Sequence, residues 1–151
     1  MSSDWSTGLL VLHAFGASFM AGLGWFVQIV HYPLFAFVDR DQWDEYHSEH
    51  SRRTAGVVAV PWAIQGFTAL ALVAARPAGV SVVLIGIAVV LAGVTVAATV
   101  AFALPAHASL ARAFDPDVHR RLVRTNWVRT VAWTSAVMVA AVMLVQYVAA
   151  C

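Results

Sequence analysis

Apolar residues fill four long stretches of the chain, and short polar connections separate them. The stretches cover about residues 8–37, 54–75, 79–104 and 126–150. Each reaches the roughly 20 residues that an α-helix needs to cross the hydrocarbon core of a bilayer. Because only helices satisfy the backbone of such segments without water, the pattern predicts an all-α, integral membrane four-helix bundle. We expect residues 1–151 to form a single transmembrane domain.

The polar connections carry helix signals of their own, which predict short interfacial helices on one side of the membrane. Asp41 is expected to cap a helix over residues 42–53 that leads into the second span. Asp115 and Pro116 have the same pattern, with Asp at the cap and Pro at the first helical position. No Gly or Pro follows before Ala150, so a helix of about 50 Å is expected there. Its first turns should project into the cytoplasm and leave His119 in solvent.

Composition supports the membrane assignment and excludes several classes of protein. The chain is 61% hydrophobic and 11% charged, whereas soluble domains carry about 25% charged residues. A net charge of +1 gives no sign of nucleic-acid binding. The single cysteine, Cys151, excludes a disulfide framework and a thiolate-rich metal site. The expected partners are membrane lipids and a small molecule, and a homo-oligomer is left open.

Charge is distributed unevenly between the two sides of the predicted bundle. All nine basic residues are Arg, and only Arg76 lies on the same side as the two termini. The other eight lie in the two remaining connections or at their flanks. By the positive-inside rule, the Arg-rich connections face the cytoplasm and the termini lie outside the cell membrane. We take the first stretch as a retained span rather than a signal peptide.

Polar side chains of all four spans fall at the cytoplasmic end. Small residues form one stripe of the first span, and small residues let helices pack closely in lipid. That stripe ends in Gln28 and His31, so both are expected to point into the bundle. His47 and His50 have the i, i+3 spacing of one helix face just before the second span, and His107 ends the third. The pattern therefore predicts that these side chains converge.

Four neutral imidazoles at one place favour a transition-metal site. His31, His47, His50 and His107 are the candidate ligands, with Cu or Fe favoured and Zn as an alternative. Gln28, Gln65 and Asn126 are candidates for supporting the cofactor, since second-layer hydrogen bonds orient imidazole ligands. His13 is expected near the opposite membrane surface and outside this group.

Catalytic candidates lie beside the imidazoles. An Arg inside a span is costly in lipid, so Arg129 is expected to line a cavity and to hold an anionic group. Asn126 and Glu49 complete the candidate catalytic residues. On an ideal helix Glu49 points away from the two neighbouring His residues, and the alternative is that it pairs with Arg52 or Arg53.

Two other classes of function use the same residues. In a small transporter or channel, Gln28, Gln65 and Arg129 would line a polar path. In a scaffold subunit, the polar residues would only fix the register of the helices. Enzymatic activity is favoured because the polar residues gather at one end, whereas a path should continue across the membrane.

The order of features resembles small four-helix membrane proteins of the anthrone-oxygenase-like group. The likeness covers a Gly-rich first span with the exit His31-Tyr-Pro-Leu34, the end of the third span (Leu104-Pro-Ala-His-Ala-Ser-Leu110), and the entry Asn126-Trp-Val-Arg129. This resemblance implies a membrane-bound oxygenase that acts on an aromatic, polyketide-like substrate. Where that group carries Asn this sequence has His, which favours a metal site that the group does not require.

The first span alone is similar to that of the haem-dependent, membrane-bound protoporphyrinogen oxidase. The similarity rests on Leu12-His13, Met20-Ala-Gly-Leu23 and His31-Tyr32. It implies haem b as an alternative cofactor, although the functional Lys of that family has no counterpart here. Together the patterns predict a metal-dependent membrane oxidoreductase that acts on a small lipophilic substrate.

Overall fold

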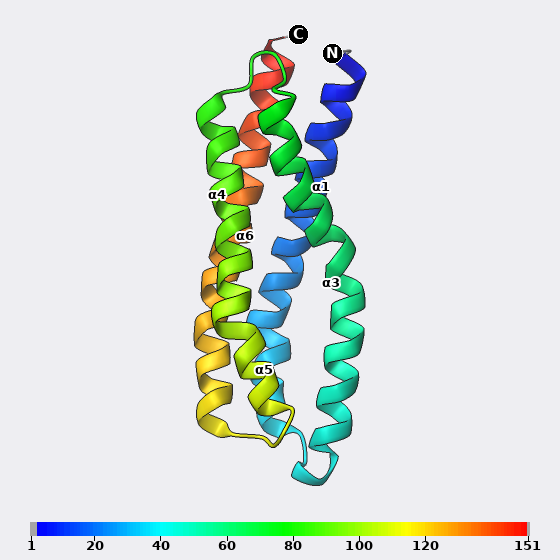
Figure 1. The fold of residues 1–151 in the computed structure, drawn as a ribbon, viewed down its shortest axis with the longest axis vertical. Helices are drawn as coiled ribbons and strands as arrows, with labels where there is room; N and C mark the ends of the chain where they lie inside the picture. Colours follow the sequence, from blue (N-terminus) through cyan, green and yellow to red (C-terminus); the bar gives the residue numbers. More distant parts are fainter. Residues whose placement is uncertain (1–2, 151) are drawn as a thin grey trace.

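Four long helical rods run side by side in the computed structural model, which describes residues 3–150 (Figure 1). The first rod is α1 (Ser3–Phe26), followed by the π-helical turn η1 (Val27–His31), α2 (Tyr32–Leu34) and the 3₁₀ turn η2 (Phe35–Phe37). The second is the 3₁₀ turn η3 (Arg40–Gln42) with α3 (Trp43–Ala74). The third is α4 (Val82–Ala98), the π-helical turn η4 (Thr99–Ala103) and α5 (Leu104–Leu110), and the fourth is α6 (Pro116–Ala149). The predicted all-α four-helix bundle is confirmed.

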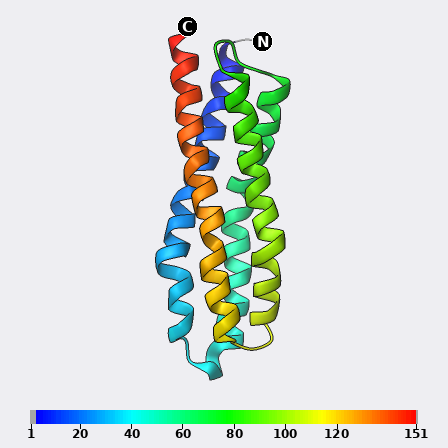
Figure 2. The same ribbon diagram turned by 90° about the vertical axis from the view of Figure 1, so that its left-hand side faces the viewer.

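The two ends of the bundle differ in what they contain. Both termini and the α3–α4 connection lie at one end, which we call the termini end (Figures 1 and 2). The α1–α3 and α5–α6 connections lie at the other, which we call the Arg-rich end. Four helical segments are long and apolar enough to cross a membrane, as a multi-pass membrane protein requires. Cys151 lies outside the described residues.

The bundle buries polar side chains together with an apolar core, and it also carries large apolar side chains on its outside. His13, Gln65, Thr95 and Thr130 are completely buried. Many large apolar side chains lie instead on the outer surface, among them Phe67, Val83, Met138 and Val145. This distribution suits a bundle in lipid, where close packing and hydrogen bonds between helices replace the hydrophobic effect.

Helix ends confirm one of the two predicted caps. The Asp115 side chain accepts hydrogen bonds from the backbone N–H groups of residues 117 and 118, with Pro116 at the start of α6. The predicted Asp41 cap is wrong, because α3 begins after Gln42, whose side chain makes no capping bond. A 3₁₀ turn over Arg40–Gln42 occupies the position where Asp41 was expected to cap. The segment predicted as an interfacial helix forms the first turns of the continuous helix α3.

A tight turn joins α3 to α4. Gly79 has a φ of 77°, and the Val80 N–H bonds the Pro77 carbonyl at 3.3 Å. Only Gly adopts this left-handed conformation without strain. A Cβ at Gly79 would also lie 2.3 Å from the Cβ of Ala150. The turn therefore packs directly against the end of α6.

Two prolines explain the π-helical turns that interrupt the first and third rods. Pro33 follows η1 and Pro105 follows η4 by the same interval. A proline inside a helix collides with the carbonyl four residues before it and lacks an N–H. At both sites the chain inserts an extra residue, so that the Tyr32 N–H bonds the Val27 carbonyl and the Leu104 N–H bonds that of Thr99. Such π-bulges occur frequently at functional sites, and these two lie beside the polar residues described next.

Candidate functional site

Four histidines from three separate segments meet at the Arg-rich end of the bundle. His31 ends η1, His47 and His50 share a face of α3, and His107 lies on α5. Ring centroids are 4.7 Å apart for His31 and His50, 5.4 Å for His47 and His107, and 5.5 Å for His50 and His107. We call these four residues the His cluster. The structure thus brings together all four imidazoles proposed as metal ligands.

The imidazoles bind one another in two hydrogen-bonded pairs. His31 Nε2 lies 2.7 Å from His50 Nδ1, and His47 Nε2 lies 3.2 Å from His107 Nδ1. In each pair one nitrogen must carry the proton and the other must accept it. The Tyr32 hydroxyl extends the second pair, with Oη 3.0 Å from His107 Nε2. In the first pair, Thr54 Oγ1 lies 3.1 Å from the same His50 Nδ1 that His31 contacts. The His cluster therefore shares protons without any carboxylate partner among these contacts.

The donor chemistry of the His cluster fits a transition metal, whereas its present arrangement is paired. Two nitrogen ligands on a tetrahedral ion with bonds of roughly 2 Å lie about 3.3 Å apart. The His47–His107 separation of 3.2 Å is close to that value. Within residues 3–150, however, no group of three or more His, Cys, Asp or Glu side chains is arranged to hold one ion. A metal held by three of these nitrogens would therefore require the imidazoles to rearrange.

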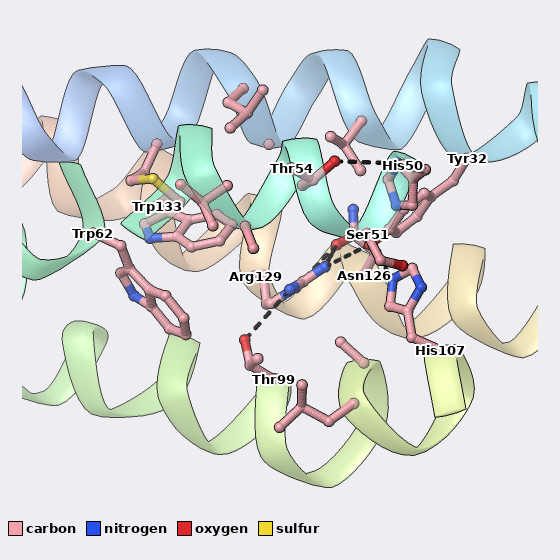
Figure 3. A pocket seen from close by; sticks show the side chains of 18 residues that line it. Tyr32, His50, Ser51, Thr54, Trp62, Thr99, His107, Asn126, Arg129 and Trp133 are labelled. Carbon is pink, nitrogen blue, oxygen red and sulfur yellow. Dashed lines mark hydrogen bonds between the residues drawn. The ribbon is translucent and has the colours of Figure 1, made fainter. Parts of the chain in front are cut away.

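Arg129 connects the His cluster to a second group of polar residues. Its guanidinium donates to Asn126 Oδ1 at 3.0 Å, to Thr99 Oγ1 at 3.3 Å and to Tyr32 Oη at 3.3 Å. Asn126 in turn donates to Gln28 Oε1 at 2.9 Å, and Gln28 donates to the Val123 carbonyl at 3.1 Å. Tyr32 therefore touches both the guanidinium and the His107 ring (Figure 3).

A cavity of about 260 Å³ lies beside these residues (Figure 3). Its polar wall includes Tyr32, His50, Thr99, His107, Asn126 and Arg129. Its apolar wall includes Met20, Leu23, Val27, Val58, Trp62 and Trp133. Ala55 and Leu104 also border the cavity and are exposed on the outer surface of the bundle. The pocket therefore reaches the outer surface of the bundle near these two residues.

Glu49 points away from the pocket. Its carboxylate accepts hydrogen bonds from Arg52 Nη2 at 2.7 Å and from Arg53 Nε at 2.8 Å. The alternative that Glu49 pairs with these two residues is confirmed. Because the carboxylate forms ion pairs on the outer surface of α3, we propose no catalytic role for it.

The three amide side chains take different places from those expected. Asn126 donates to Gln28 and accepts a hydrogen bond from Arg129, so the two amides orient the guanidinium rather than an imidazole. Gln65 lies deeper in the bundle, about 22 Å along α3 from His50. Its Oε1 accepts a hydrogen bond of 3.1 Å from Trp133 Nε1, and Trp133 itself lines the pocket. Gln65 is thus separated from the pocket by one indole ring.

Two other histidines are buried outside the His cluster. His119 is buried, not solvated, because Phe35 and Phe114 pack against its ring and its Nε2 lies 2.7 Å from the Tyr32 carbonyl. The first turns of α6 therefore pack against the neighbouring rods. His13 lies outside the His cluster, as expected, but it is completely buried, with Nδ1 3.0 Å from Thr68 Oγ1.

Three site residues were absent from the predicted set. Tyr32 and Thr99 bond Arg129, and Thr54 bonds His50. Tyr32 and Thr99 belong to the two segments beside Pro33 and Pro105, so the proline-induced turns are the signal that would have pointed to them. Comparison of the chain with family models, curated proteins and solved structures found no match. The proposed function therefore rests on the geometry of this site alone.

Proposed function

We propose that the chain is a membrane-embedded oxidoreductase that binds a transition-metal ion through the His cluster and oxidises a small lipophilic substrate. Dioxygen would be the oxidant. One observation carries the proposal: His50 and His107 belong to the His cluster and also line the pocket. A metal held by these imidazoles would therefore face a substrate in the cavity.

The chain's own residues would bind and shield the substrate. The apolar wall of the pocket, including Trp62 and Trp133, favours a lipophilic body and limits the access of water. The exposed border at Ala55 and Leu104 would let the substrate enter from the membrane. Tyr32 supports both sides of the site, because its hydroxyl contacts His107 and Arg129. A bound copper or iron ion would supply the redox chemistry.

The size of the cavity favours a bare ion over haem. Pockets for drug-sized ligands usually have about 300–1,000 Å³, and a haem is larger than most such ligands. A cavity of about 260 Å³ suits a small substrate beside a metal. Haem b is the alternative cofactor. Absorbance of the purified protein near the Soret region would distinguish bound haem from a bare metal ion.

The orientation in the membrane follows from the Arg distribution. We propose that the Arg-rich end faces the cytoplasm and the termini end faces the outside, in the cell membrane. The pocket and the His cluster would then lie in the cytoplasmic half of the bilayer.

Metal analysis of the detergent-purified protein tests the proposed function. We expect one or two first-row transition-metal ions per chain and a lower melting temperature in chelator, because the metal stabilises the folded state that binds it. A folded protein that carries no metal, takes up no added Cu, Fe or Zn, and melts identically in chelator would refute the proposal.

The hydrogen-bonded pairing of the imidazoles favours one other candidate, a transporter or proton-conducting protein. Paired imidazoles and hydroxyls can pass protons along hydrogen bonds without a metal. Buried polar residues also continue beyond the His cluster, through Trp133 and Gln65 to Thr68 and His13. This candidate would take the place of the metalloenzyme if the metal test fails.

A further inference from the structure

We propose that the pocket binds a lipophilic organic anion, whose negative group is held by Arg129. This inference rests on the proposed function, because it takes the pocket as the substrate site, and it specifies the chemical class of the substrate.

Arg129 is a cation with only neutral partners. Its hydrogen bonds go to the amide oxygen of Asn126 and the hydroxyl oxygens of Thr99 and Tyr32. No Asp or Glu belongs to the residues that line the pocket. The ion pairs of the described residues join Arg52 and Arg53 to Glu49, and Arg120 to Asp117. The charge of Arg129 is therefore not neutralised by any described side chain.

The position of Arg129 makes an uncompensated charge costly. It lies about 20 Å along α6 from Pro116, inside a helical segment that is long and apolar enough to cross a membrane. Charged residues within membrane-spanning helices face cavities and pair with other groups, and they mark binding sites. An anion in the adjoining pocket would supply the missing partner.

The surroundings of the guanidinium orient it for such a ligand. Gln28 fixes Asn126, which holds one edge of the guanidinium, and Thr99 and Tyr32 hold it from the neighbouring rods. The Trp133 ring lies on another side, with its centroid 5.8 Å from Cζ. Figure 3 shows Arg129 in the middle of the pocket, between Tyr32, Thr99, Asn126 and Trp133. These hydrogen bonds use four of the five guanidinium N–H groups and leave one on Nη1. A carboxylate or phenolate fits this placement because it accepts that N–H and neutralises the charge, while the apolar wall takes an aromatic or aliphatic body.

A matched pair of probes tests the inference. The purified protein is placed in nanodiscs of zwitterionic lipid, and its binding of 2-naphthoate and of the neutral isostere 2-naphthamide is measured by calorimetry, with empty nanodiscs as the blank. We expect naphthoate to bind at least about tenfold more tightly, since a hydrogen bond to a charged group is stronger than a neutral one. Equal binding of the two probes, or no saturable binding of naphthoate, overturns the inference.

Variants test whether Arg129 causes the preference for naphthoate over naphthamide. Arg129→Gln should abolish the difference between the probes, and Arg129→Lys should retain most of it. Arg124→Gln is the matched control, because Arg124 is exposed on the same helix, and it should bind both probes as the original protein does. A preference for naphthoate that persists in Arg129→Gln contradicts the assignment. If Arg129→Gln does not fold, the comparison of the two probes on the original protein still decides.

Two further measurements are needed. The first distinguishes a lipid headgroup from a soluble anion, and the second distinguishes failure of the anion site from failure of the proposed oxidoreductase. Nanodiscs with anionic lipid weaken naphthoate binding if a lipid headgroup occupies the site, and leave it unchanged if the site is reserved for a soluble anion. Metal content is measured on the same samples. Protein that carries no metal, takes up no added metal, melts identically in chelator and still prefers naphthoate refutes the proposed oxidoreductase and leaves the anion site standing. Metal-loaded protein without the preference refutes only the anion site.

Discussion

The bundle buries histidines in two regions, and the two regions are built differently. At the Arg-rich end, the rods are interrupted by π-helical turns next to Pro33 and Pro105, and four imidazoles meet beside a cavity. Toward the termini end, His13 is packed alone where α1 crosses α3, with Thr68 as its hydrogen-bond partner. At that crossing a Cβ on Gly16 would lie only 2.9 Å from the Pro61 carbonyl oxygen and the Gln65 nitrogen.

This difference shows what separates a candidate site from a buried polar contact. Both regions contain fully or largely buried imidazoles, so burial alone does not distinguish them. At the Gly16 crossing the two backbones are in contact, and a small residue is what lets them approach. At the Arg-rich end the interrupted rods leave a cavity that polar side chains from all four rods face. The Arg-rich end is therefore the candidate site because polar side chains from four rods meet there beside a cavity.

The largest expected difference between the two ends is their exposure to the two sides of the membrane. In a Cys151→Ser background, Ala78→Cys places a thiol in the α3–α4 turn and Ala113→Cys places one in the α5–α6 connection; both positions are exposed. A membrane-impermeant thiol reagent should label Ala78→Cys in intact cells and label Ala113→Cys only after lysis. The reverse pattern would invert the proposed topology.

The second comparison concerns metal binding by the two kinds of histidine. We expect His107→Ala to lower metal affinity more than about hundredfold, because the loss of a mere second-layer partner already costs 10–100-fold. The matched His13→Ala variant should keep its metal, since His13 lies outside the His cluster. Affinity is measured by competition with a chromophoric chelator. Equal losses in the two variants would show that the effect is general destabilisation and not the removal of a ligand.

The same two regions show which features of the site could be predicted from the sequence and which could not. The spans and the convergence of the His cluster were predictable, because helix length and the spacing of polar residues along each span are local properties. The pairing of His31 with His50, and the position of Tyr32 between His107 and Arg129, depend on how the π-helical turns rotate the rods. The burial of His119 depends on the rings that pack against α6. Such contacts between rods are not encoded in the periodicity of any single span.

A third comparison tests the tight crossing itself. Gly16→Ala should destabilise the protein by about 1–3 kcal/mol, the usual cost of overpacking, because its Cβ would meet backbone atoms of α3. Gly22→Ala is the control on the same helix, since a Cβ there meets nothing within 4 Å. Both changes gain the same helix propensity, so their difference isolates the crossing. Unfolding in detergent with increasing denaturant gives the two free energies, and equal values would mean that the crossing tolerates a methyl group.

The smallest expected effect is the loss of affinity on removing one tyrosine hydroxyl. Two tyrosines at opposite ends of the bundle allow a comparison. The Tyr32 hydroxyl contacts His107 and Arg129, whereas the Tyr147 hydroxyl accepts a hydrogen bond from Thr7 at 3.2 Å near the termini end. A single hydrogen bond contributes about 0.5–1.5 kcal/mol net, so Tyr32→Phe should weaken the binding of naphthoate or metal by roughly two- to tenfold. Tyr147→Phe removes the same atom from the other end and should leave both affinities unchanged. Calorimetry with naphthoate and chelator competition measure the two affinities on each variant. If Tyr32→Phe binds both as the original protein does, the hydroxyl does not couple the His cluster to Arg129, and the two groups act as separate sites.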